Sequence, residues 1–500
     1  MRRSEPACRL AVVAIALAVG LGLPGPSSRA MAEPPPRSGS LERRLPATAE
    51  RMLRQPGAER PHPAEPARAV SDGNSETEAV LWAWDFYRET YYPVPVRRLH
   101  VSPSTWIYVE EGLELPGSAL LRLTAFAEDR ALPILRQLYG AEPSPGIDDE
   151  PAISLLLLDI RDAHYYHAPT DHFVSGYFDP VNEILPEALA AEGDPRKSNG
   201  REMVYIDIGS PVDPIGDDLL RAIAHELAHL ILWFRDPEES EWLEEGLSEL
   251  AGFVCGLGHP RELVNLYLRN TERPLTAWSG EPEDIGKGYV FALYLYDRFE
   301  RETPGWIREW LAQDASGLSG LAAQLDGSGL GLPELVLDYS LALQLDAESP
   351  SDARYAFRSL ALGSSQPPDG FRAPAARSHS GERPIDLGFL LSPWSARVDA
   401  IGALSRPLAL DLDLPAGTCA ALARVGEGLE EPAVEAFCLD DPAPIARRSI
   451  PEPADAAWHQ RLLVITLNPR DLDATARLSV QLGSASTIGR RLFLPRLDSR

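Results

Sequence analysis

Residues 221–252 read R-A-I-A-H-E-L-A-H-L-I-L-W-F-R-D-P-E-E-S-E-W-L-E-E-G-L-S-E-L-A-G and contain two short motifs. The first is H-E-x-x-H, formed by His225, Glu226 and His229, and the second is W-L-E-E-G, which ends at Gly246. Apolar residues recur at spacings of three and four through the first motif, which predicts an amphipathic helix; they are Leu219, Ile223, Leu227, Leu230 and Phe234. On such a helix the two histidines lie one turn apart on another face.

Two imidazoles at positions i and i+4 of a helix can bind one zinc ion, and a glutamate beside the first histidine can act as the base for a zinc-activated water. A catalytic zinc site has three protein ligands and one open position. Glu245 lies sixteen residues after His229, directly before a glycine in a second apolar-patterned run, and is the candidate third ligand. Glu241, Glu244 and Glu249 are rival carboxylates for this position. The alternative for these three is the solvated acidic face of a helix.

The two motifs together resemble the gluzincin clan of zinc peptidases, in which the glutamate of a W-L-x-E-G motif on a second helix is the third ligand. The resemblance therefore assigns His225, His229 and Glu245 to Zn²⁺ and Glu226 to catalysis. By resemblance to the E-x-x-x-D pattern of related enzymes, Glu249 would accept the free N–H of a ligand histidine. The alternative for Glu249 is an ordinary surface carboxylate.

Three strand-like runs precede the predicted helix, at residues 153–160, 173–179 and 203–208. They predict an α+β upper subdomain, followed after Gly246 by a helical lower half. The runs V-S-G-Y-F-D (174–179) and S-N-G-R-E-M-V-Y-I-D (198–207) precede A-H-E-L-A-H as in hyicolysin-like secreted metallopeptidases. This resemblance implies that an edge strand with Val174, Gly176 and Phe178 pairs with the substrate backbone. An ordinary interior strand is the alternative.

The segment I-G-K-G-Y, residues 285–289, departs from the same clan. It resembles a helix that in many gluzincins begins Y-x-K-G, whose tyrosine binds the oxyanion of the tetrahedral intermediate. Ile285 occupies that tyrosine position, and loss of such a donor typically costs about a hundredfold to a thousandfold in turnover. Tyr289, one helical turn later, could substitute for it, or it could be a core tyrosine.

The remaining chain divides by composition. Residues 1–32 resemble a secretory signal, with Arg2 and Arg3, an apolar run and a cleavage site near Ala32, which predicts a secreted or periplasmic protein. The apolar run is too short to span a bilayer, so no transmembrane segment is expected in the mature chain. The full division predicted is 1–32 signal peptide, 33–75 disordered leader or propeptide, 76–362 metallopeptidase domain (76–235 upper, 236–362 lower), 363–384 linker and 385–500 β-sandwich.

Charge and cysteines restrict the partners. The formal net charge of −27 argues against nucleic acid or anionic lipid. Cys419 and Cys438 lie in the predicted sandwich and could pair in an exported protein, and Cys255 fits a buried thiol.

The expected function is a secreted zinc endopeptidase acting on a protein or peptide, with the C-terminal domain available for surface or substrate attachment. The alternatives are a catalytically weak or inactive interaction protein on a peptidase fold and an aminopeptidase.

Overall fold

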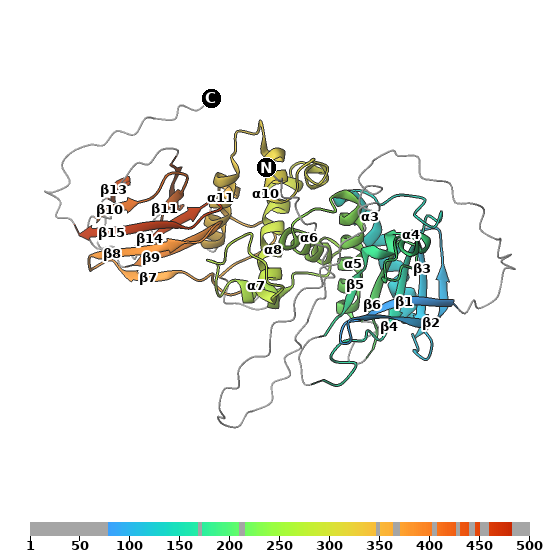
Figure 1. Cartoon of the computed structure of the whole chain (residues 1–500). Helices are drawn as coiled ribbons and strands as arrows, with labels where there is room; N and C mark the ends of the chain where they lie inside the picture. Colours follow the sequence, from blue (N-terminus) through green and yellow to red (C-terminus); the bar gives the residue numbers. More distant parts are fainter. Residues whose placement is uncertain are drawn as a thin grey trace, which may run out of the picture. The chain divides into compact units, whose positions relative to one another are not determined.

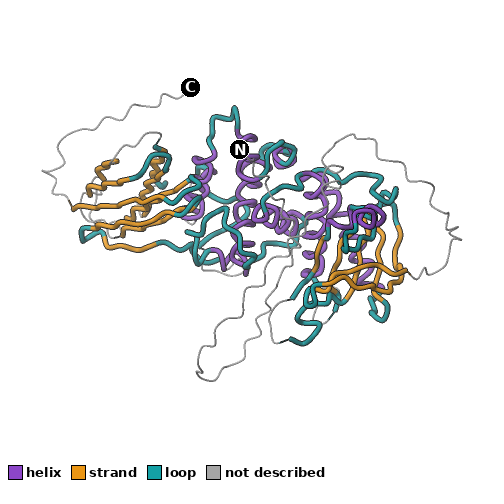
Figure 2. The backbone as a smooth tube through the Cα atoms, in the orientation of Figure 1, coloured by secondary structure: helices purple, strands orange, loops and turns teal. Residues whose placement is uncertain are grey.

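The computed structural model describes residues 79–168, 173–209, 216–346, 351–363, 371–402, 408–426, 431–439, 446–450 and 460–482 (Figures 1 and 2). The predicted signal peptide and the predicted leader lie outside the described residues. The described residues form two compact units: the first ends at His259 and also contains residues 307–312, and the second contains residues 260–306 and those after 312. Within the described ranges, no helix combines the length and the apolar character needed to cross a membrane.

The first unit is built on a mixed six-stranded sheet of order β1-β2-β3-β4-β6-β5. Neighbouring strands are antiparallel from β1 to β3 and parallel from β3 through β4 to β6, and β5 is antiparallel to β6. The three predicted strands are confirmed as β4, β6 and a shorter β5 at the sheet edge. The strands are β1 (Ala79–Asp85), β2 (Thr90–Val101), β3 (Thr105–Glu110), β4 (Ile153–Leu158), β5 (Gly176–Phe178) and β6 (Met203–Asp207).

The hairpin of β1 and β2 reaches across one face of this sheet to β5, although β1 and β5 are opposite ends of the strand order. The Trp84 N–H donates to the Tyr177 hydroxyl at 2.9 Å, and the Tyr91 hydroxyl donates to the Asp179 carboxylate at 3.0 Å. Side chains from the strands and their connections enclose an apolar core on this face, including Leu81, Trp84, Val94, Tyr108, Leu156, Tyr177 and Tyr205. The sheet therefore curves, and β5 is anchored from that face.

Helix α5 (Asp217–Arg235) packs against β5 and β6, and α3 and α6 pack against α5 (Figure 1). Asp217 and Asp218 in its first turn and Arg235 in its last turn complement the helix dipole. Its buried residues run from Leu219 to Trp233 with few interruptions, as expected of a central helix. The other elements of this unit are α2 (Gly117–Phe126), η1 (Ala127–Ala131), α3 (Leu132–Tyr139), η2 (Pro180–Glu183), α4 (Pro186–Glu192) and α6 (Glu241–Val254).

The second unit contains a helical part and a C-terminal β-rich part, which form separate layers (Figure 2). Helix α8 begins with a proline in its first turn followed by Glu283 and Asp284, a favourable N-terminus. The helices are α7 (Arg261–Tyr267), α8 (Pro282–Leu295), η3 (Tyr296–Glu300), α10 (Gly317–Leu325), α11 (Leu332–Leu345) and η5 (Ala353–Tyr355); α9 (Trp306–Trp310) lies almost wholly in the first unit's second segment.

The β-rich part is a sandwich of a four-stranded sheet, order β13-β10-β15-β8, and a five-stranded sheet, order β12-β11-β14-β9-β7. Inward-facing residues of both sheets share one core, among them Leu391, Ile401, Leu410, Leu422, Val464 and Leu478. Cys419 and Cys438 form the predicted disulfide between β11 and β12. The strands are β7 (Arg377–Ser380), β8 (Ile385–Leu391), β9 (Ser395–Gly402), β10 (Leu408–Asp413), β11 (Cys419–Gly426), β12 (Ala433–Cys438), β13 (Ala446–Ile450), β14 (Gln460–Asn468) and β15 (Ala474–Leu482).

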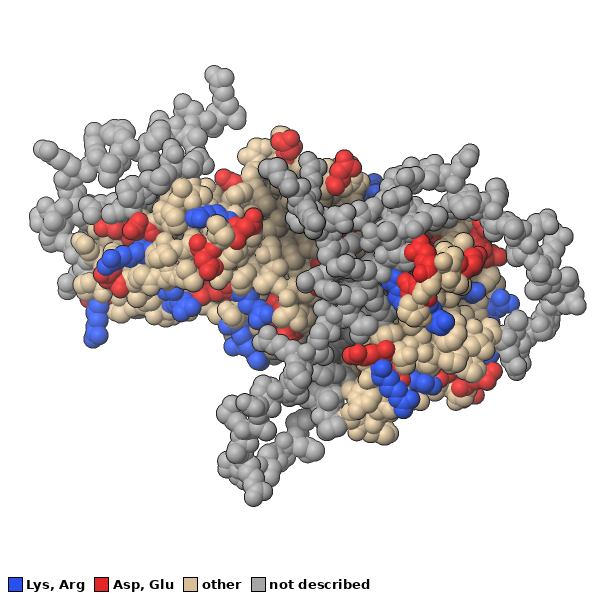
Figure 3. Space-filling view, in the orientation of Figure 1, with Lys and Arg blue, Asp and Glu red and all other residues tan. Residues whose placement is uncertain are grey.

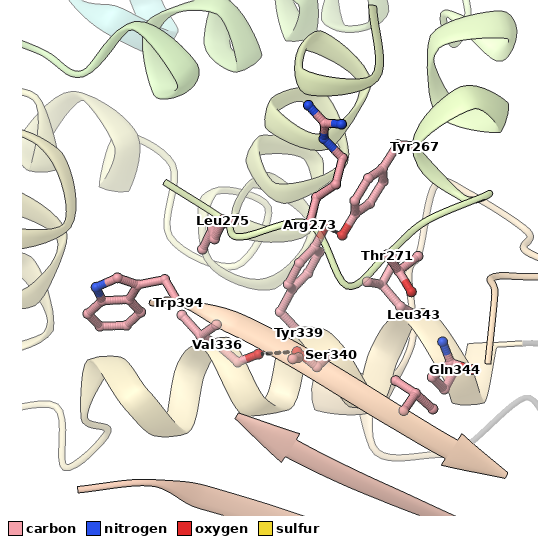
Figure 4. Close-up of a pocket in the computed structure, with 12 residues that line it drawn as sticks. Tyr267, Thr271, Arg273, Leu275, Val336, Tyr339, Ser340, Leu343, Gln344 and Trp394 are labelled. Atoms are coloured by element: carbon pink, nitrogen blue, oxygen red, sulfur yellow. Dashed lines mark hydrogen bonds between the residues drawn. The ribbon is translucent and has the colours of Figure 1, made fainter. Parts of the chain in front are cut away.

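Helix α11 packs against β11, β12 and β14, so the helical part and the sandwich belong to the same unit. Residues that line a pocket between them are drawn in Figure 4, and some of their polar groups bond to one another. The Tyr339 hydroxyl donates to that of Tyr267 at 3.1 Å, and the Leu275 N–H donates to the Trp394 carbonyl at 2.8 Å. The pocket is part of this junction, which joins residues on both sides of the predicted 363–384 linker.

Both units carry charges of both signs. On the face drawn in Figure 3, acidic and basic side chains are interspersed among neutral ones. Several are paired, as Arg477 is with Asp386 at 2.5 Å and Arg377 with Glu272 at 2.7 Å. The prediction that nucleic acid is not a partner stays a prediction.

Candidate metal centre

His225 and His229 project from α5 toward the same point. Their Nε2 atoms are 2.9 Å apart, and both side chains are buried. Helix α6 packs against α5 and brings Glu245 to them, with its carboxylate oxygens 3.6 Å from His225 Nε2 and 3.4 Å from His229 Nε2. One donor atom from each of the three residues lies within 4.8 Å of the others.

The three side chains fit a metal ion. Neither carboxylate oxygen of Glu245 accepts a hydrogen bond from the residues that the structure describes, although the residue is fully buried. Burying a carboxylate without a partner costs free energy. The two Nε2 atoms face each other at hydrogen-bond distance, so when at most one of them carries a proton, at least one nitrogen lone pair is directed at the same space. A cation at the centre of the group would satisfy all of these acceptors. The buried group of His225, His229 and Glu245 could therefore hold a metal ion.

Electrostatics within the group favour a positive charge there. Burial lowers the pKa of His225, but contact with Glu245 and Glu249 outweighs burial and raises it to about 9. The pKa of His229 is likewise raised well above its usual value, since Glu245 and Glu244 outweigh burial. Burial would raise the pKa of Glu245, but the two imidazoles lower it to about 2. Because the neighbouring carboxylates raise the pKa values of both histidines, protons and a cation would compete for these ligand atoms.

Each histidine has a carboxylate at its other ring nitrogen. Glu249 lies with one oxygen 3.3 Å from His225 Nδ1, and its second oxygen is 3.3 Å from the Arg221 guanidinium. By resemblance, Glu249 was expected to accept the free N–H of a ligand histidine; among the described residues His225 Nδ1 has no hydrogen-bond partner, so that role stays a prediction. Glu244, named as a rival ligand or as part of a solvated acidic face, lies 2.9 Å from His229 Nδ1. The sequence feature that could have predicted this contact is the position of Glu244 next to Glu245. Adjacent helical residues are offset by about 100° and can both reach a facing helix.

Glu226 is fully buried beside the two histidines, where α5 packs against β5. The Phe178 N–H approaches its carboxylate without the geometry of a full hydrogen bond, since neither oxygen has a hydrogen-bond partner within the described part of the chain. Burial raises the pKa of Glu226 to about 7, and the imidazoles of His225 and His229 oppose that rise. A carboxyl group with a pKa near neutrality can accept and release a proton under ordinary conditions.

Strand β5 is the sheet edge nearest to Glu226. The Asp207 N–H donates to the Ser175 carbonyl at 2.9 Å, so by antiparallel alternation the backbone groups of Gly176 are directed away from β6. Val174 packs in the core on the hairpin side of the sheet, and Phe178 is nearly fully buried. The edge position of this strand agrees with the sequence, and its predicted pairing with substrate stays a prediction.

The predicted oxyanion contact falls in the second unit. Ile285 and Tyr289 both lie on α8, where Ile285 is 3% and Tyr289 0% exposed. Lys287 between them is also buried, and its ammonium donates to the Pro274 carbonyl at 3.0 Å and lies 3.2 Å from the Asp284 carboxylate. Lys287 thus holds the loop before α8. The catalytic role predicted for Tyr289 stays a prediction.

Comparison with known proteins identifies no family. No protein-family model matches the sequence, and no curated protein matches it. The pre-peptidase C-terminal domain of a collagenase from Bacillus anthracis aligns over 21% of this chain and 95% of its own, with 12% identity and a TM-score of 0.16. A family GH115 4-O-methyl-α-glucuronidase with specificity for decorated arabinogalactans aligns over 67% of this chain and 51% of its own, with 11% identity and a TM-score of 0.14. Both TM-scores are too low to support an argument about fold or function.

Proposed function

We propose that this protein is an exported zinc metallopeptidase of the gluzincin type that hydrolyses internal peptide bonds of protein or peptide substrates. The observation that carries the proposal is the convergence of His225, His229 and Glu245 around a common point, with the unpaired Glu226 carboxylate beside them. Export rests on the signal-like residues 1–32 and agrees with the disulfide between Cys419 and Cys438.

The donor set supports zinc over other cations. Two imidazoles and one carboxylate form a common catalytic zinc set, and tetrahedral zinc then keeps one position open. Calcium and magnesium prefer sets made entirely of oxygen. Glu249 and Glu244 at the outer ring nitrogens would orient both imidazoles with Nε2 as the ligand atom.

Glu226 is the proposed general base and acid. Zinc in such a site acts as a Lewis acid that makes water a nucleophile near neutral pH. Glu226 would take a proton from the attacking water and deliver it to the leaving amine nitrogen. Its burial and its pKa near neutrality suit both transfers, although a bound dication would lower that pKa. The outward-directed backbone of Gly176 would pair with the substrate backbone at the edge of β5.

The main alternative is an interaction protein that keeps the metal group without catalysis. Glu226 argues against it, because a fully buried carboxylate whose oxygens have no hydrogen-bond partner destabilises the fold. A scaffold that only binds gains nothing from that cost. A site that transfers protons needs such an unpaired group.

Two measurements test the proposal. Elemental analysis of the purified mature chain should find about one zinc per molecule. Glu226→Gln should retain that zinc and lose cleavage of an unfolded protein substrate, because the amide cannot act as a base. Metal-free protein would exclude a zinc enzyme. Zinc-loaded protein that cleaves nothing, or a Glu226→Gln variant that cleaves as well as the unchanged chain, would favour the alternative or a different base.

A further inference from the structure

Gly176 on β5 faces Glu226 at a distance that leaves no room for a side chain. A Cβ atom built at Gly176 would lie 2.9 Å from Glu226 Cγ, 3.1 Å from Glu226 Oε1 and 3.0 Å from the Tyr205 carbonyl oxygen. Carbon atoms in ordinary contact are about 3.5 to 4.0 Å apart. The backbone at Gly176 does not have a positive φ, so the strand conformation does not require glycine there. Glycine is required at this position because the gap to Glu226 and the Tyr205 carbonyl is too small for a Cβ atom.

Neither side of this contact can withdraw freely. Strand β5 is anchored from the opposite face by Tyr177, whose ring stacks on Tyr205 with centroids 4.2 Å apart and whose hydroxyl accepts the Trp84 N–H. Glu226 is fixed in α5 between the two histidines of the metal group. A methyl group at residue 176 would therefore displace the Glu226 side chain, its nearest neighbour, before the strand or the helix.

We infer that Gly176 is a positioning residue, whose missing side chain sets how closely the Glu226 carboxylate approaches the sheet edge. The inference rests on the proposed function, because it assigns Gly176 to the placement of the proposed base. It differs from a backbone contact with substrate, since it concerns the Cβ position and not the N–H or the carbonyl of residue 176.

The first test is Gly176→Ala. It should keep zinc content unchanged, because none of the three atoms nearest to the added methyl group belongs to His225, His229 or Glu245. It should lower kcat by roughly 10- to 100-fold through displacement of the base. KM should change little, since the backbone of residue 176 remains. The matched control is Gly117→Ala, where an added Cβ has no neighbour within 4 Å and φ is not positive. Unchanged kcat in Gly176→Ala, or loss of zinc, would overturn the inference.

The second test needs no catalysis and therefore separates this inference from the proposed function. Gly176→Ala should lower the melting temperature by a few degrees in the otherwise unchanged chain. It should lower it less in a Glu226→Ala background, where Cγ and the carboxylate are gone. If Gly176→Ala fails to fold, recovery of folding in the double variant supports the contact. Equal destabilisation in both backgrounds, or failure of both variants to fold, would contradict it, whether or not the protein proves to be a peptidase.

Discussion

Replacing Glu249 with alanine should weaken zinc binding without removing a ligand. The Glu249 side chain is 2% exposed and lies between His225 Nδ1 and the Arg221 guanidinium, 3.3 Å from each. Its removal takes away the carboxylate nearest to His225 Nδ1, an atom that has no hydrogen-bond partner among the described residues, and lets the ring turn. Loss of such an outer partner typically costs 10- to 100-fold in metal affinity, which is about 1.4 to 2.8 kcal/mol.

The stability cost of the same change should be moderate. Arg221 keeps its hydrogen bonds to the Leu257 carbonyl at 2.7 Å and the Gly258 carbonyl at 3.1 Å. It is therefore not left as an unpaired buried charge, which would cost more. We expect a loss of about 1 to 3 kcal/mol in the free energy of unfolding of the metal-free protein, the range for an orphaned buried polar group.

The zinc affinity of Glu244→Ala should be compared with that of Glu249→Ala. Glu244 is closer to its histidine, at 2.9 Å, but its side chain is 26% exposed, so water can replace it as acceptor. Its effect on zinc affinity should be smaller, below about tenfold. Glu187→Ala on the exposed face of α4 controls for the loss of one negative charge.

Competition with a chelator of known zinc affinity, at fixed pH and ionic strength, measures all of these variants on one scale. Glu249→Ala is expected to lose zinc first as the chelator concentration rises, followed by Glu244→Ala, with Glu187→Ala matching the unchanged chain. Wild-type affinity in Glu249→Ala would refute the assigned role of this contact. A larger effect of Glu244 than of Glu249 would refute the argument from burial.

Three further outcomes are expected. Because Glu245 and Glu249 outweigh burial and raise the pKa of His225 to about 9, protons compete with the cation below that pH, so zinc affinity should rise roughly tenfold or more per pH unit from about 6 to 9. A flat titration series would contradict this. Replacing both Cys419 and Cys438 with serine opens a bridge of sequence separation 19 and should cost roughly 3 kcal/mol, lowering a calorimetric transition of the second unit while zinc content stays constant. Truncation after Leu362 should give an insoluble or destabilised chain, since it uncovers the face of α11 that packs on β11, β12 and β14; a soluble chain with an unchanged helical melting transition would show that the sandwich is separable.

The two histidines of the metal group and the elements that support them were predictable because they depend on short-range patterns. The period of α5 could be read from Leu219 to Phe234, and the strands β4 and β6 are almost continuously apolar. A helix fixes the relative placement of residues three and four apart, so the approach of His225 to His229 needed no tertiary information. The contact of either histidine with Glu245 required the resemblance, because sequence spacing does not determine how two helices pack.

Elements that depend on long-range packing were missed. The hairpin of β1 and β2 was given no strand assignment, and Pro93 and Pro95 within β2 obscure its pattern. Its contact with β5 through Trp84 and Tyr177 joins residues 93 apart in sequence. The junction of α11 with the sandwich was hidden in the same way. A Pro/Gly/Ser-rich segment indicates where a boundary could fall, but not whether the parts on either side share a surface.

Glu226 and Glu245 show what the structure adds to the motif. Both glutamates are fully buried, and burial raises the pKa of each, yet the pKa of Glu226 rises to about 7 while that of Glu245 falls to about 2. The difference arises because the Glu245 carboxylate lies 3.6 and 3.4 Å from the Nε2 atoms of the two imidazoles, whereas at Glu226 burial outweighs the attraction of the imidazoles. Two neighbouring carboxyl groups whose environments drive their pKa values apart are suited to different tasks. The ionised Glu245 carboxylate is suited to bind a cation, and Glu226 is suited to exchange a proton near neutral pH, which agrees with the different roles proposed for them.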